Sequence, residues 1–214
     1  MTETKRVTIY TDGACIGNPG PGGYGAVLLY NEHRKELSGG YRETTNNRME
    51  IMAAIVGLRA LKAPCEVTLY SDSQYLVNAM MKGWAKKWRA FGWMRNKNKD
   101  PAINPDLWAQ MLELCDTHVV EFKWVRGHSG NKENERCDFL SVQAAKRGNL
   151  PADAEYERAR RERFVAQAYE SKRPYESNGP PHGSQKPDES KRPHGSQTPR
   201  GSKRRHGSKK RRKQ

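Results

Sequence analysis

The sequence predicts an α/β fold in which a mixed five-stranded sheet is flanked by helices. Five segments are rich in β-branched and aromatic residues or alternate apolar with polar positions, as strands do. After the third of these segments, stretches with helical spacing of apolar residues separate the remaining strands. A helix usually connects parallel neighbours, whereas a short turn joins antiparallel ones. We therefore expect strands one to three to be antiparallel, and strands four and five to run parallel to the first.

The first strand, at residues 5–12, ends in a pattern that recurs later in the chain. The segment Thr8-Ile-Tyr-Thr-Asp12 is echoed by Thr68-Leu-Tyr-Ser-Asp72. If the two strands pair in parallel and in register, the two carboxylates lie about 5 Å apart at the strand ends. Two anions at that distance repel each other unless a cation separates them, so the pair indicates a site for a hard divalent cation. The alternative is that each Asp only begins a turn.

A glycine- and proline-rich segment follows, and we interpret residues 13–25 as a loop. It is not a phosphate-binding P-loop, because no Gly-Lys-Ser/Thr follows and the next segment, residues 25–30, has the pattern of a strand. A hairpin then leads to a third strand at residues 36–42.

The segment Thr44–Asn47 offers capping side chains for a helix at residues 48–62, which Pro64 ends. Glu50 lies one turn into this helix, and the positions at helical spacing from it are apolar. We therefore expect Glu50 to face the sheet, where a buried carboxylate needs a partner. The alternative is an ordinary first-turn Glu that interacts with the helix dipole.

A second helix at residues 73–81 leads into an aromatic and basic stretch. Six basic residues lie between Lys86 and Lys99. An aromatic stripe at helical spacing is usually part of a core, but beside this many cations it also suits a surface that lies on a nucleic-acid backbone. Both interpretations stay open. The stripe comprises Met81, Trp84, Trp88 and Phe91.

Four further elements complete the prediction: a helix at 105–117, a strand at 119–125, a helix at 131–146 capped by Asn131, and a charged helix at 152–170. Glycines flank His128 in the loop before the 131–146 helix, although such a histidine is often only a loop residue. Asp138 recurs at helical spacing with apolar residues, so it should face inward.

The basic charge of the chain is concentrated at its C-terminal end. The 214 residues carry a net charge of +15, of which +11 belongs to residues 171–214 and only +4 to residues 1–170. The last segment contains no Leu, Ile, Val, Met, Phe or Trp, so it cannot bury enough apolar surface to offset the entropy of ordering. We predict a disordered basic tail at residues 171–214.

The remaining composition bears on the compartment. No stretch of 18 apolar residues occurs, and the N-terminus has no apolar core of a signal peptide, so membrane spanning and secretion are not expected. The four cysteines are widely spaced and match neither a disulfide framework nor a zinc pattern. These features favour a cytoplasmic protein.

Four carboxylates are thus expected to face the interior at the ends of neighbouring elements, with His128 nearby: Asp12, Glu50, Asp72 and Asp138. A ligand set made only of oxygens favours Mg²⁺, or Mn²⁺ as a substitute, over zinc. Two such ions about 4 Å apart suit in-line phosphoryl chemistry.

Four motifs, in order, resemble type 1 ribonuclease H of the bacterial kind, over residues 5 to 147. They are YTDGACIGNPGPGGYG from Tyr10, TTNNRME from Thr44, SDSQY from Ser71, and GHSG followed by ENERCD from Gly127 to Asp138. The resemblance implies a ribonuclease H-like fold with a mixed five-stranded sheet. It also implies endonucleolytic hydrolysis of the RNA strand of RNA–DNA hybrids, which leaves 3′-hydroxyl and 5′-phosphate ends.

The same resemblance implies roles for individual residues. The four carboxylates would be metal ligands, and His128 would assist proton transfer or product release. Selection of RNA requires contact with the 2′-hydroxyl, which the family makes at positions matching Cys15, Asn46 and Gln74. Residues Asn18 and Thr45 match a pocket for a DNA phosphate. The lobe from Trp84 to Trp93, including Lys86, Lys87 and Trp88, matches the family's handle on the DNA strand.

The resemblance divides the chain into a catalytic part at 1–150, a helical extension at 151–170 and the basic tail at 171–214. The segment Phe139-Leu140-Ser141 departs from the family pattern, and the tail is an addition of this chain. The tail is expected to be an electrostatic arm that adds nonspecific affinity for nucleic acid; a solubilising extension or a nuclear-import signal are its alternatives. A monomer is expected.

Two other functions compete with the hybrid-specific nuclease. A noncatalytic nucleic-acid-binding protein on the same scaffold should have lost a carboxylate, and all four are present. A DNA-cutting relative should lack the TTNNRME and GNPG signatures, which this chain has.

Overall fold

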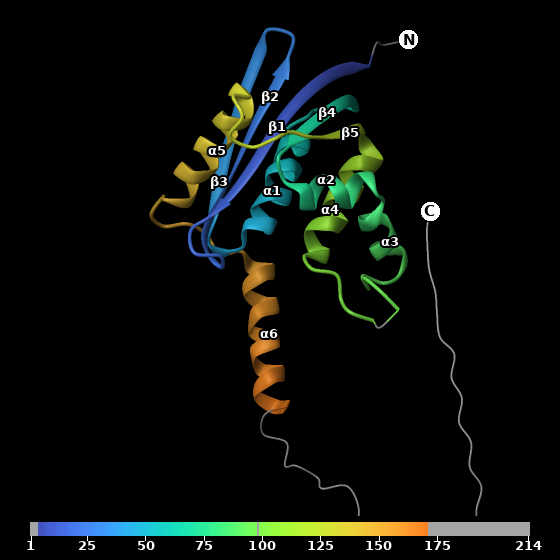
Figure 1. Cartoon of the computed structure of the whole chain (residues 1–214), viewed down its shortest axis with the longest axis vertical. Helices are drawn as coiled ribbons and strands as arrows, with labels where there is room; N and C mark the ends of the chain where they lie inside the picture. Colours follow the sequence, from blue (N-terminus) through green and yellow to red (C-terminus); the bar gives the residue numbers. More distant parts are fainter. Residues whose placement is uncertain (1–3, 98, 171–214) are drawn as a thin grey trace, which may run out of the picture. The chain divides into compact units, whose positions relative to one another are not determined.

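The computed structural model describes residues 4–97 and 99–170, so the predicted disordered tail at 171–214 lies outside the described residues. Within them, five strands form one sheet in the order β3-β2-β1-β4-β5 (Figure 1). The strands are β1 (Lys5–Cys15), β2 (Gly20–Tyr30), β3 (His33–Thr44), β4 (Cys65–Ser71) and β5 (Val119–Trp124).

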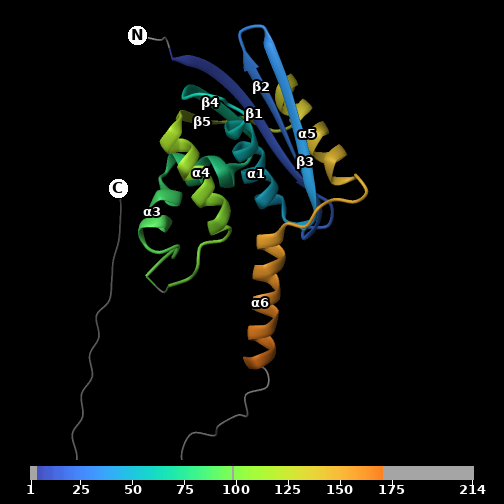
Figure 2. The ribbon, with the colours of Figure 1, turned by 180° about the vertical axis from the view of Figure 1, so that it is seen from behind.

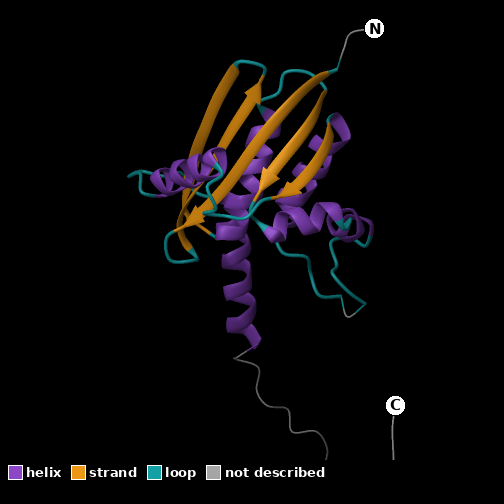
Figure 3. Ribbon diagram, turned by 45° about the horizontal axis from the view of Figure 1, so that its top comes forward, coloured by secondary structure: helices purple, strands orange, loops and turns teal. Residues whose placement is uncertain are grey.

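The strand directions confirm the expected mixed sheet. β1 pairs antiparallel with β2, and β2 pairs antiparallel with β3. β4 lies parallel to β1 and β5 lies parallel to β4 (Figure 3). Thr8 is opposite Thr68 and Tyr10 is opposite Tyr70, so the repeated pattern pairs in the predicted register. The rings of Tyr10 and Tyr70 stack with centroids 4.8 Å apart.

The described residues also form six helices: α1 (Asn46–Arg59), α2 (Gln74–Met81), α3 (Trp84–Ala90), α4 (Pro105–Thr117), α5 (Lys132–Ala145) and α6 (Ala154–Glu170). α5 lies on one face of β1, β2 and β3, and α1 lies on the other face, as the front and back views show (Figures 1 and 2). The apolar stripe of α1 and the buried side of α4 form the main core with the sheet, around Ile9, Ile55, Leu69 and Trp108.

The glycine-rich segment is not the loop that the sequence predicts. β1 continues to Cys15 and β2 begins at Gly20, so only residues 16–19 separate the strands. The glycines are in a strand because they permit close packing: a Cβ at Gly23 or Gly25 would overlap a backbone carbonyl oxygen of α5. Glycine here serves the approach of a helix to the sheet rather than a turn.

The same extension changes the place of the first acidic residue. Asp12 lies inside β1 rather than at its end, whereas Asp72 directly follows β4 as predicted. The helix bounds also differ from the prediction, most of all for α1, which begins at Asn46 and ends at Arg59 rather than spanning 48–62. Asn131 caps α5 as expected, accepting hydrogen bonds from the backbone N–H groups of Glu133 and Asn134.

The aromatic stripe divides between core and surface. Trp88 packs against the core, with its ring 5.9 Å from that of Trp108 in an edge-to-face arrangement. Met81, Trp84 and Phe91 are 67%, 38% and 63% exposed. The packing of the half-buried Trp88 therefore supports the core interpretation for that residue, while the other three present apolar surface to solvent.

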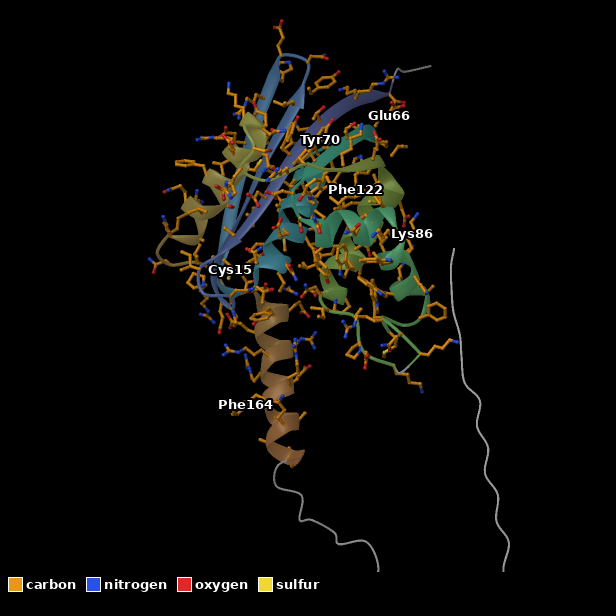
Figure 4. The ribbon with its side chains drawn as sticks, viewed as in Figure 1. Cys15, Glu66, Tyr70, Lys86, Phe122 and Phe164 are labelled. Carbon is orange, nitrogen blue, oxygen red and sulfur yellow. The ribbon has the colours of Figure 1, made fainter. Side chains whose placement is uncertain are left out.

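The predicted charged helix is present as α6, and its first half contacts the rest of the described chain. These contacts include β3 and, through the ring of Tyr156, Arg48 on α1, whereas the side chains of residues 160–167 are exposed. Figure 4 shows Phe164 on this helix away from the sheet. All four cysteines are free thiols. Across the described ranges, none of the helices is both long and apolar enough to traverse a bilayer.

The close approach of α5 to β2 generates a stability prediction. Gly25→Ala should destabilise the protein by about 3 kcal/mol, because the new methyl group would force apart the strand and the backbone of α5 at Cys137. Urea denaturation monitored by circular dichroism measures the change. Gly148→Ala is the matched control, since a Cβ there would meet only open space. Equal stability of the two variants would contradict the packing role assigned to Gly25.

Candidate active site

Three carboxylates converge at one place beside the sheet. Asp12 comes from β1, Glu50 from the first turns of α1, and Asp72 from the residue after β4. One carboxylate oxygen of each lies within 4.8 Å of the others. Asp12 and Glu50 are buried and Asp72 is half-buried. The parallel register of β1 and β4 brings the two aspartates together, as their repeated sequence pattern predicts.

Gly13 makes the approach of the third carboxylate possible. A Cβ at this position would overlap the backbone N of Glu50 and the carbonyl carbon of Met49. β1 therefore contacts the backbone of α1 directly at Gly13. This contact places Glu50 next to Asp12, the residue before Gly13. Gly127 likewise packs closely against Asp72, because a Cβ added at this glycine would lie 2.5 Å from Oδ2 of Asp72.

Each carboxylate accepts a hydrogen bond that fixes its orientation. The backbone N–H of Gly13 donates to Oδ1 of Asp12 at 2.7 Å. The side-chain amide of Asn46 donates to Oε1 of Glu50 at 3.3 Å. Asn134, on α5, donates to Oδ2 of Asp72 at 3.1 Å.

The second oxygen of Glu50 is buried and has no hydrogen-bond partner among the described residues. An unpaired buried carboxylate oxygen is costly unless a ligand occupies the space beside it. The three residues offer only hard oxygen donors, which suit a divalent cation such as Mg²⁺. These residues therefore fit a metal site.

The electrostatics of the cluster agree with that interpretation. Burial, and then the charge of Asp72, raises the pKa of Asp12 to about 8. Burial, and then the charges of Asp12 and Asp72, raises the pKa of Glu50 well above its usual value. Both shifts favour the uncharged form of these two side chains, and a bound cation would oppose them.

Asp138 and His128 lie near the cluster but not in it. Asp138 is half-buried on α5 and close enough for its charge to contribute to the raised pKa of Asp12. It is not one of the carboxylates whose oxygens lie within 4.8 Å of each other. His128 is exposed in the loop between β5 and α5, at a positive φ of 49°. The structure thus joins three of the four predicted carboxylates, with the fourth beside them.

Four of the predicted substrate-binding residues gather where the β1–β2 turn meets the start of α1. The backbone N–H of Asn46 donates to Oδ1 of Asn18 at 3.1 Å. The thiol of Cys15 donates to the carbonyl oxygens of Gly20 and Thr44, both at 3.5 Å. Thr45, the fourth of the group, is the N-cap residue of α1 and makes no side-chain capping bond, contrary to the expectation for this segment.

The remaining predicted contacts lie elsewhere. Gln74 is exposed at the start of α2 and lines a shallow pocket of about 280 Å³ with Asn78 and Trp124. Trp84, Lys86, Lys87 and Trp88 all belong to α3. Lys86 and Lys87 are exposed, and Figure 4 shows Lys86 on the outer side of this lobe. Trp88 is half-buried against the core, so α3 presents its charges and Trp84 to solvent.

Sequence reasoning missed two residues that touch the cluster. Asn134 donates to Asp72, and its place four residues before Asp138, one helical turn away, was a usable signal. The indole N–H of Trp124 donates to the backbone carbonyl of Asp72 at 3.0 Å. Its position at the end of β5 gave no comparable signal, because the contact depends on the pairing of β5 with β4.

Comparison with known proteins gives consistent matches. A family model described as RNase H matches residues 4–146. A protein named ribonuclease H from Desulforamulus reducens is 68% identical over 152 residues, which cover 71% of this chain and 95% of that protein. A protein of the same name from Syntrophus aciditrophicus is 70% identical over 152 residues, covering 71% of this chain and 87% of that protein.

Solved structures match as well. LC9-RNase H1, described as a type 1 RNase H with the type 2 active-site motif, is 33% identical with a TM-score of 0.60, covering 68% of this chain and 74% of that one. LC11-RNase H1, solved in complex with an RNA/DNA hybrid, is 27% identical with a TM-score of 0.50 and covers 65% of this chain and 96% of that one.

The raised pKa of Asp12 generates a pH prediction for the metal-free protein. The pKa of Asp12 is higher in the folded chain (about 8) than in the unfolded chain (3.8). The contribution of protonated Asp12 to the stability of the fold is therefore complete below pH 3.8 and is lost as the pH rises through about 8. In the presence of a chelator, the free energy of unfolding should therefore decrease as the pH rises from 3.8 to about 8. The decrease should be smaller in Asp12→Asn. Urea denaturation across this pH range measures it.

Asp116→Asn is the control for this experiment, because Asp116 is an exposed aspartate on α4. It should follow the wild-type pH profile. Superimposable profiles of Asp12→Asn and the wild type would show that Asp12 is ionised in the folded protein without a cation.

Proposed function

Because the chain belongs to the ribonuclease H family, we propose that it hydrolyses the RNA strand of RNA–DNA hybrids at the cluster formed by Asp12, Glu50 and Asp72. Cleavage is endonucleolytic and leaves 3′-hydroxyl and 5′-phosphate ends. The observation that carries the proposal is the convergence of three carboxylate oxygens within 4.8 Å, one side chain having a buried and unpaired oxygen.

The proposed cofactor is a pair of Mg²⁺ ions, for which Mn²⁺ can substitute. Asp12, Glu50 and Asp72 would hold them, with Asp138 as a fourth ligand from α5. When bound, the cations supply activation of the attacking water and neutralisation of charge on the scissile phosphate. Support comes from the hard oxygen donors and from the raised pKa values of Asp12 and Glu50, which a bound cation would lower.

The protein's own residues hold this site ready for the substrate. Gly13 and Asn134 orient the two aspartates, and Asn46 orients Glu50 through hydrogen bonds that already exist in the free protein. Such preorganisation leaves little rearrangement to be made during the reaction. His128 is proposed to assist proton transfer or product release, and its exposed position between two glycines suits either role.

Distinction between the two strands is proposed to come from two groups of residues. Cys15, Asn46 and Gln74 contact the 2′-hydroxyls that only the RNA strand carries. The DNA strand is held by Asn18 and Thr45 at a phosphate and by the α3 lobe, whose contacts are Trp84, Lys86, Lys87 and Trp88. The hydrogen bond between Asn18 and Asn46 supports this arrangement, because it joins the two groups rigidly.

The rest of the chain has proposed roles consistent with this activity. Residues 1–150 form the catalytic part, 151–170 a helical extension, and 171–214 an arm that adds nonspecific nucleic-acid affinity. The net charge of +11 in the last segment supports that role. We further propose that the protein acts as a monomer in the cytoplasm; its four free thiols suit a reducing compartment.

Strand-labelled duplexes test the function directly. With Mg²⁺, the protein should cut the RNA strand of an RNA–DNA hybrid and leave RNA–RNA and DNA–DNA duplexes intact. Asp12→Asn should lower kcat by about 10³-fold or more, because loss of a ligand removes several kcal/mol of transition-state stabilisation. Its fold and hybrid binding should remain.

Glu66→Gln provides the control, since Glu66 is an exposed carboxylate on β4 that pairs with Arg6. It should retain wild-type kcat. Cleavage of the DNA strand by the wild-type protein, or full turnover by Asp12→Asn, would refute the proposal.

The arm is tested by deleting residues 171–214. The deletion should leave kcat unchanged, raise KM, and flatten the dependence of hybrid affinity on salt, because fewer cations would then be available to contact phosphates. A matched control keeps the length of the segment and replaces its Lys and Arg residues with Gln. An unchanged salt dependence in both variants would remove the arm from the binding mechanism.

A further inference from the structure

A buried ion-pair network links the segment after α5 to the start of α1. The guanidinium of Arg48 donates to both oxygens of Asp153, at 2.7 and 2.9 Å, and to both oxygens of Asp106 on α4, at 2.9 and 2.7 Å. The side chains of Arg48 and Asp153 are only 4% and 5% exposed. Two buried charges with this many hydrogen bonds permit one arrangement and resist others.

Asp153 also accepts hydrogen bonds from residues other than Arg48. Its Oδ2 also accepts a hydrogen bond from the hydroxyl of Thr44 at 2.8 Å, where β3 ends. Its Oδ1 accepts from the backbone N–H of Tyr156 at 3.3 Å and so holds the first turn of α6. Two residues earlier, the carbonyl oxygen of Pro151 accepts from the backbone N–H of Arg42 at 2.9 Å. One carboxylate thus joins three elements.

The contacts of Asp153 lie on both sides of a short turn that carries the substrate-binding residues. Thr44 precedes this turn and Arg48 follows it; the residues between them are Thr45, Asn46 and Asn47. Asn46 contacts Asn18 through its backbone and a metal-site carboxylate, Glu50, through its side chain. A shift of the turn would therefore move the contacts to both strands together.

We propose that Asp153 is a positioning residue for the hybrid, which holds the Thr44–Arg48 turn so that Thr45 and Asn46 meet the substrate without rearrangement. The inference rests on the function proposed above. Asp153 lies beyond residues 4–146, the part that matches the family model, whereas its partners Thr44 and Arg48 lie within it. A turn that is already ordered binds its ligand at a lower entropic cost, which lowers KM.

The rest of α6 offers a matched comparison. Glu157 forms a bidentate ion pair with Arg42, and Arg160 pairs with Glu43, whereas the described hydrogen bonds of Thr44 and Arg48 include neither α6 side chain. The Arg42 side chain is exposed, at 62%, so this pair is worth little stability. Loss of the Glu157 pair should loosen α6 without moving the turn.

The experiment compares three variants of the full chain under steady-state conditions, well below their melting temperatures. Asp153→Asn removes the charge, and Thr44→Val removes only the hydroxyl that contacts Asp153. Both should raise KM for the hybrid about tenfold, with kcat changed less than about threefold. Glu157→Gln should match the wild type in both constants. Thermal unfolding of each variant separates stability from positioning.

An altered melting temperature with an unchanged KM in Asp153→Asn would reduce Asp153 to a structural role and overturn the inference. If Asp153→Asn does not fold, Thr44→Val decides alone, because it keeps the Arg48–Asp153 pair and is nearly isosteric. A raised KM in Glu157→Gln equal to that of Asp153→Asn would also overturn it, since general loosening of α6 would then explain the effect. A wild-type protein that fails to cut the RNA strand would instead refute the proposed function.

Discussion

The mutual repulsion of three clustered carboxylates, two of them buried and one half-buried, is the constraint on which this structure depends. Asp12, Glu50 and Asp72 have oxygens within 4.8 Å of each other in a site largely removed from solvent. The hydrogen bonds that the carboxylates accept are too few to offset burial and repulsion at Asp12 and Glu50, as the raised pKa values of these two groups show. The stability of the core holds the three carboxylates together despite their repulsion. A divalent cation bound between them would relieve this repulsion.

Glycine is the residue that makes this geometry possible. Gly13 lets β1 touch the backbone of α1, and Gly25 lets β2 touch the backbone of α5. Both helices therefore lie closer to the sheet than side chains would allow, one on each face. Glu50 and Asn134 are brought to the aspartates by these two close approaches. The close backbone contacts at these glycines therefore position the site as much as the acidic side chains do.

Much of this arrangement was predictable from local pattern, and the rest depended on tertiary contacts. The echo between Thr8–Asp12 and Thr68–Asp72 predicted the parallel pairing and its register, because side-chain period and register are coupled in a sheet. Composition alone made residues 13–25 resemble a loop, because glycine in a strand is explained only by the helix that packs on it. The pairing of Arg48 with Asp153 had no local signal, since these residues are 105 positions apart.

The order of the site residues along the chain has a consequence for biosynthesis. The three clustered carboxylates are all present by residue 72, whereas Asn134 and Asp153 come much later. A nascent chain therefore carries the acidic groups long before it has the helix that orients Asp72 or the carboxylate that braces α1. The hydrogen bond that orients Asp72 and the ion pair that holds Arg48 on α1 can therefore form only after residues 134 and 153, respectively, have been synthesised.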